Sequence, residues 1–142
     1  RDRLRSRGLG DVYKRQTYGY ITGLSFVNQL GLTTQMPAVI EIVTNTEATN
    51  GRTVMVGSQK VRVKKSAVPV SSNNAELLQL LDCVGQAEKY TELSLKETVD
   101  TMLSYVRQKR FTKEQLSEVS YAINGATAKK LIEWGIIYEF RS

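Results

Sequence analysis

The sequence predicts an α+β fold, with a small antiparallel sheet carrying one packed short helix, followed by a helical C-terminal region. A β-branched run at 39–44 and two alternating segments at 52–56 and 60–64 are typical of strands. From residue 75 onward the apolar residues recur at helical spacing, and a Ser/Asn-rich linker at 71–74 separates the two patterns. We therefore expect an α/β core over 17–70 and a helical extension over 71–142 packed on that core.

Residues 22–31 predict the short helix. Leu24, Val27 and Leu30 recur at i, i+3 and i+6, which gives one apolar stripe. Thr22 or Ser25 is positioned to accept from the first free amides, and Gly31 to end the helix in a left-handed conformation. The stripe needs a partner surface, which we expect the sheet to supply.

The strand at 39–44 is bounded by Pro37 and by Asn45-Thr46, and its composition predicts that it is largely buried. The segments 52–56 and 60–64, joined through Gly57-Ser58, predict an antiparallel hairpin. Alternation places Arg62 and Lys64 toward water. The hairpin residues expected to face the core are Val54, Val56, Val61 and Val63.

Two capping boxes predict helix starts in the C-terminal region, Ser94 with Glu97 and Thr112 with Gln115. An apolar helical stretch precedes them over 77–84, and Asn124-Gly125 separates the third helix from a last one at 126–134. We expect 136–140 to run extended. Helices followed by an extended piece would also suit a winged helix, but packing of the helices onto the sheet is the preferred interpretation.

The basic character of the chain is concentrated at its start. The first sixteen residues hold six of the 20 basic and two of the 14 acidic residues, so the net charge falls from +6 to +2 without them. The string SRGLGDVYKRQ at 6–16 resembles the conceptual translation of a transposase-based sequencing adapter, with 11–16 reading GAT GTG TAT AAG AGA CAG. We therefore exclude 1–16 from fold and function, as for a tag. The alternative is a disordered basic tail.

The composition of the chain limits the kinds of catalytic and metal site that it can form. Histidine is absent, which excludes His-dependent triads and His-ligated metal sites, and a single cysteine, Cys83, lies in an apolar helical stretch suited to a buried role. Of the carboxylate pairs Glu92 with Glu97 and Glu114 with Glu118, the second has i,i+4 spacing on a helix, which is typical of a solvated face. We predict no enzyme activity, no cofactor and no metal. With no bilayer-length apolar run and no visible signal peptide, a cytoplasmic location is expected.

Two groups of cations are candidate phosphate contacts. The first group lies on the second hairpin strand and just after it, at Lys60, Arg62, Lys64 and Lys65. The second is the pair Lys129 and Lys130 on the last helix. No aromatic residues interleave with the strand cations to stack bases, so an ordinary hydrophilic face is the competing interpretation.

The stretch ITGLSFVNQLGLTTQMP at 21–37, followed by the strand to Thr44 and by Gly51-Arg52, resembles the AbiEi-like antitoxins of type IV toxin–antitoxin systems. The likeness is clear over about 18–66 and looser beyond. Phe26 and Val27 stand where that family has small Ala and Leu residues. The motif residues, interpreted as a structural corner, are Gly23, Asn28, Leu30, Gly31, Leu32, Thr34 and Pro37. Gln35, a long amide on the loop, is the candidate partner contact.

The resemblance implies the second domain of a transcriptional regulator that antagonises a nucleotidyltransferase-like toxin and supports operator repression. The family's N-terminal winged helix, which binds operator DNA, would lie upstream of Thr17 and is expected to be missing. The alternative is a stand-alone nucleic-acid-binding module that uses the strand or helix cations. A hydrolase or transferase is the third possibility, favoured least by this composition.

Overall fold

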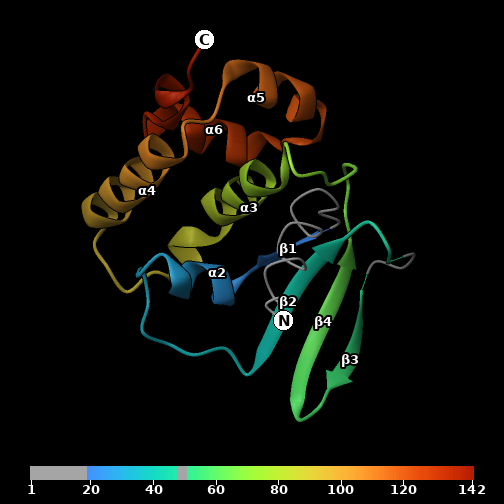
Figure 1. Cartoon of the computed structure of the whole chain (residues 1–142). Coiled ribbons are helices and arrows are strands. Elements are labelled where there is room, and N and C mark those ends of the chain that lie inside the picture. The colour runs from blue at the N-terminus through green and yellow to red at the C-terminus, as the bar shows by residue number, and fades with distance from the viewer. Residues whose placement is uncertain (1–18, 48–50) are drawn as a thin grey trace, which may run out of the picture.

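A computed structural model of the chain describes residues 19–47 and 51–142 (Figure 1). The expected α+β class with a helical C-terminal region is confirmed. The strands are β1 (Gly19–Thr22), β2 (Val39–Thr44), β3 (Arg52–Val56) and β4 (Gln59–Lys65). The helices are α2 (Leu24–Gln29), α3 (Ala75–Tyr90), α4 (Leu95–Lys109), α5 (Lys113–Val119) and α6 (Gly125–Glu133), with short 3-10 helices η1 (Ser120–Ala122) and η2 (Ile136–Glu139).

The four strands form one sheet in the order β1-β2-β4-β3, and this sheet is mixed. β1 with β2 and β3 with β4 are antiparallel, but β2 and β4 run parallel, from Val39 beside Lys60 to Thr44 beside Lys65. The prediction of a purely antiparallel sheet is corrected at this central pairing. After β2 the chain runs in the opposite direction along β3 at the edge of the sheet, and it then turns at Gly57 into β4, which lies between β2 and β3. Because β4 is antiparallel to β3, it runs in the same direction as β2.

The start of the described chain differs from the expectation for 22–31. Residues 19–22 form a strand, and α2 begins only at Leu24, with Gly23 as its N-cap at φ 71°. Thr22 does not cap the helix, because its hydroxyl donates to Asp82 instead. Ser25 Oγ is buried without a hydrogen-bond partner among the described residues. Gly31 does take the predicted left-handed conformation, at φ 83°.

The helices pack on the side of the sheet that carries Arg62 and Lys64, not on the side of the predicted core valines, although Val61 is buried at 7% exposure as predicted. Tyr20 and Thr22 of β1 hydrogen-bond to Asp82 on α3, so their side of the sheet is the side on which α2 and α3 pack; we call it the helix face. Register and alternation put Lys64 on this face and Val61 on the other. The opposite face, here called the open face because no described helix packs on it, carries a set of buried or half-buried apolar side chains. They are Ile21, Ile40, Ile42, Val54, Val61 and Val63.

The helices cover only the β1–β2 half of the sheet, so charged side chains of β4 can lie on the helix face without being buried. α2 packs on β1 and β2, and α3 on β1, whereas β3 and β4 extend beyond the helices (Figure 1). Arg62 is therefore exposed as predicted although it lies on the helix face, while Lys64, nearer the helices, is partly buried. Val56, predicted to face the core, is 64% exposed at the end of the edge strand.

The helices of the C-terminal region begin at capping residues that the sequence shows. Both capping boxes are formed, at Ser94 for α4 and at Thr112 for α5, and Asn124 caps α6. The prediction for 136–140 is wrong over most of its length, because 136–139 form η2 after a left-handed Gly135. No wing therefore follows α6 in the described chain. None of the described helices is long and apolar enough to cross a membrane.

The buried core lies mainly among the helices. α3 contributes eight buried residues, including Leu80 and Val84, and α2 inserts Phe26 and Val27 from the sheet side. A row of rings continues the core, since Phe26 meets Tyr105 edge-on and Phe111 stacks on Phe140. Val68 and Val70 of the β4–α3 connection join the same cluster. The connection just before the linker at 71–74 is thus part of the main core.

Candidate functional site

The cations of β4 do not form one surface. Lys60, Arg62 and Lys64 project from the helix face, and Lys65 from the open face. Lys64 Nζ lies 2.7 Å from Glu41 Oε1 on the neighbouring strand, so its charge is largely balanced. Lys60 and Arg62 are exposed, and neither forms an ion pair with a described residue. Two cations that pair with none of the described residues therefore remain on that face of the strand.

The lysines of α6 each lie near a carboxylate. Lys130 Nζ is 3.0 Å from Glu88 on α3 and lies over the Trp134 ring at 5.6 Å. Lys129 is 3.8 Å from Glu133, one turn along the same helix. These contacts balance much of the local positive charge, so α6 presents a weaker phosphate-binding surface than its sequence suggests.

The resemblance motif builds a corner between α2 and β2. Asn28 Nδ2 donates to the carbonyls of Thr33 and Gln35, each at 3.1 Å, which closes the loop onto the helix. Leu32 is fully buried, and its carbonyl accepts the backbone N–H of Glu92. The backbone N–H and the hydroxyl of Thr34 both donate to Glu92 Oε1. The corner is thus fixed to the chain segment between α3 and α4.

The remaining motif residues also have internal roles. Gly23 has φ 71°, and a Cβ there would lie 2.9 Å from Glu41 Oε2. Leu30 packs against the core and Pro37 is partly buried where the loop approaches β2. Gln35 differs from them, because it is exposed and its side chain makes no hydrogen bond to a described residue. Of the motif loop, Gln35 and its neighbour Met36 are therefore the side chains free to meet a partner.

Exposed apolar side chains gather at the end of the sheet nearest this loop. Met36 is 76% exposed, and Met55 and Val56 at the end of β3 are 59% and 64% exposed. Gln59, the register partner of Val56, donates its side-chain amide to the carbonyl of Ala38, so the loop and the β3–β4 turn lie at the same end of the sheet (Figure 1). We call Gln35, Met36, Met55 and Val56 the hairpin-end patch, which surrounds this end of the sheet because alternation puts Met55 on the helix face and Val56 on the open face.

Asp82 is a second feature, in the middle of α3. Its Oδ2 accepts from Tyr20 OH at 2.9 Å and from Thr22 Oγ1 at 3.1 Å, which ties β1 to the helix. Burial raises the pKa of Asp82, although these two hydrogen bonds and the charge of Lys64 partly offset the rise. Burial also raises the pKa of Tyr20 above its ordinary range.

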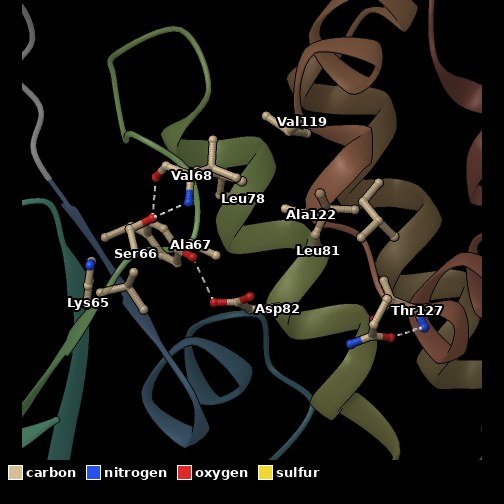
Figure 2. A pocket seen from close by; sticks show the side chains of 14 residues that line it. Lys65, Ser66, Ala67, Val68, Leu78, Leu81, Asp82, Val119, Ala122 and Thr127 are labelled. Atoms are coloured by element: carbon tan, nitrogen blue, oxygen red, sulfur yellow. Dashed lines mark hydrogen bonds between the residues drawn. The ribbon is translucent and has the colours of Figure 1, made fainter. Parts of the chain in front are cut away.

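A cavity of about 230 Å³ opens beside Asp82, between the end of β4 and the helices α3, α5 and α6 (Figure 2). We call it the interlayer cavity. Ser66 and Ala67 line it from the connection after β4, and Thr127 from α6. Val43, Val68, Leu78, Leu81, Val119, Ala122 and Ile123 make its apolar walls. The cavity was not predicted from the sequence. The one sequence feature that could have indicated it is the aspartate inside the apolar run 80–84.

Other reactive side chains have structural surroundings. Cys83 is 1% exposed beside Met102, and burial raises the pKa of its thiol to about 12, which disfavours a nucleophilic thiolate. Glu92 holds the motif corner and Glu97 completes the capping box of α4. Among residues 19–47 and 51–142, no three His, Cys, Asp or Glu side chains lie close enough together to hold a metal ion.

Comparison of the chain with protein-family models, with curated proteins and with solved structures gave no match.

Proposed function

We propose that the chain is the protein-binding half of a non-enzymatic, antitoxin-type transcriptional regulator. The observation that carries the proposal is the hairpin-end patch, where three large apolar side chains stand exposed at one end of the sheet. Exposed apolar patches with polar surroundings mark interaction surfaces, and methionines adapt to a partner because their side chains are flexible. The patch adjoins the motif that carries the family resemblance.

The geometry of the corner supports this role. Asn28, Leu32 and Thr34 use their groups inside the fold, so the loop is held in place while Gln35 and Met36 remain outside. A rigid loop loses little conformational freedom when a partner docks on it. The resemblance supplies the expected partner, a nucleotidyltransferase-like toxin. Operator DNA would be bound mainly by an upstream winged-helix module, and both partners would be met in the cytoplasm.

Growth rescue tests the proposal. The chain is co-expressed in bacteria with nucleotidyltransferase-like toxins of the type IV class, as wild type and as the double variant Met36→Asp, Met55→Asp. We expect wild type to restore growth and the double variant to fail, because two carboxylates would be desolvated at the contact. Leu95→Asp, on a side chain 56% exposed outside the patch, is the matched control and should rescue. Full rescue by the double variant, or none by wild type, contradicts the proposal.

A stand-alone nucleic-acid-binding module is the second candidate, favoured by Lys60 and Arg62, which are exposed and form no ion pair within the described part of the chain. Two or three phosphate contacts predict a slope of about −2 to −3 in a plot of log affinity against log salt. Duplex DNA is titrated with residues 17–142 over a range of salt. Binding that shows this slope and weakens in Lys60→Gln, Arg62→Gln favours this candidate, whereas no binding leaves the first proposal preferred.

A further inference from the structure

The interlayer cavity is a concave site lined by both apolar and polar side chains. Ligand cavities are concave and mostly apolar, with a few polar groups that fix the orientation of the ligand. Here eight apolar residues, from β2, the β4–α3 connection, α3 and the α5–α6 region, line the cavity together with polar side chains, among which Asp82 is the single carboxylate (Figure 2). The cavity draws its walls from both layers of the fold, so an occupant would contact sheet and helices together.

One oxygen of the Asp82 carboxylate, Oδ1, accepts no hydrogen bond from a described residue. Both hydrogen bonds to Asp82, from Tyr20 and Thr22, go to Oδ2, and no described residue donates to Oδ1. Two donors on one oxygen fix the orientation of the carboxylate. An N–H donor that enters the cavity would therefore meet a carboxylate already held in place, with little further ordering required.

The nearby charges favour a positive ligand. Lys64 is the cation that acts on Asp82 from β4, but its ammonium already lies 2.7 Å from Glu41 Oε1, so those two charges largely cancel. Lys65 lines the cavity from an exposed position, where water screens its charge. The negative charge of Asp82 is therefore left without a buried partner, and a cation beside it would make a charge-assisted hydrogen bond.

The geometry points to a binding site for a small organic cation, a primary ammonium or amidinium group joined to one ring or a short branched apolar body. The cationic group would donate to Asp82 Oδ1, and the body would pack on the valine and leucine walls. The volume of about 230 Å³ lies below the range of roughly 300–1,000 Å³ typical of drug-sized ligands, which limits the body to about one ring. The inference is independent of the hairpin-end patch.

Benzylammonium is the probe, titrated into the full chain and followed by the amide resonances of the protein. Benzyl alcohol and phenylacetate, with a neutral and an anionic head on the same ring, are titrated in parallel. Asp82→Asn keeps an acceptor for Tyr20 and Thr22 but removes the charge. Asp100→Asn, an exposed aspartate paired with Lys96 on α4, is the matched control. Ala122→Phe adds a ring at the rim of the cavity, where Ala122 is exposed, and removes no group that hydrogen-bonds to Asp82.

We expect benzylammonium to shift the resonances of cavity residues saturably, and its affinity to fall at least tenfold in Asp82→Asn and in Ala122→Phe but not in Asp100→Asn. Benzyl alcohol should bind at least tenfold more weakly than benzylammonium, and phenylacetate more weakly still. Absence of saturable shifts, equal binding of the alcohol and the cation, or unchanged affinity in Ala122→Phe overturns the inference. If Asp82→Asn does not fold by circular dichroism, the Ala122→Phe result and the comparison of the three probes decide it.

Discussion

Replacement of Asn28 by alanine tests whether the resemblance motif is a structural corner. The side chain donates two hydrogen bonds, to the carbonyls of Thr33 and Gln35, each at 3.1 Å. Each is worth about 0.5–1.5 kcal/mol net, and Thr33 is only 4% exposed, so its carbonyl would be poorly compensated by water. We therefore expect Asn28→Ala to lower the free energy of unfolding by about 2 kcal/mol.

Urea unfolding measures this change, and the one tryptophan of the chain, Trp134, reports it because it is 9% exposed in the native state. With an m value of about 2 kcal/mol per M, the midpoint should fall by about 1 M. Gln35→Ala is the control, because it removes a similar amide that makes no hydrogen bond to a described residue; its effect should stay within about 0.5 kcal/mol. Equal midpoints for Asn28→Ala and wild type would refute the structural interpretation of the motif.

Three further predictions concern the sheet and the core. Because the pKa of Asp82 is raised in the folded state, its contribution to stability is fully present below its ordinary pKa of 3.8 and is lost as the pH rises through the folded pKa. The urea midpoint of Asp82→Asn should therefore rise relative to that of wild type as the pH is raised. A difference between the two midpoints that does not change with pH would contradict the assignment. Gly23→Ala should destabilise by more than Gly57→Ala, since both have positive φ but only at Gly23 would a Cβ come within 3 Å of Glu41; equal losses would exclude that contact. Leu80→Ala should cost about 2–5 kcal/mol by the same assay, and a loss below 1 kcal/mol would show that the core relaxes around the cavity.

The parts of the fold that follow from local chemistry could be predicted from the sequence. The strand 39–44, the hairpin around Gly57 and both capping boxes depend on residues close together in the chain, and each is found where the pattern indicated. The strand at 19–22 was missed, because four residues carry little periodicity and Thr22 resembles a helix cap.

The faces of the sheet could not be predicted in the same way. Alternation tells which residues share a face, but not which face the helices cover. The partner of Thr22 and Tyr20 is Asp82, some sixty positions along the chain, and only that pairing places the helices on the side of Lys64. The interlayer cavity was missed for the same reason, since its lining residues come from seven elements, β1, β2, β4, α3, α5, η1 and α6, and from the connections between them.

The insertion of β4 between β2 and β3 has a consequence for synthesis. A nascent chain completes β2 at Thr44 but does not complete its central neighbour until Lys65. During that interval the β-branched run Val39–Thr44 presents an open edge of unpaired amides and carbonyls, the kind of template on which chains aggregate. β4 closes this edge once it is made, and its four cations, Lys60, Arg62, Lys64 and Lys65, disfavour pairing of β4 with the β4 of a neighbouring chain before the hairpin docks.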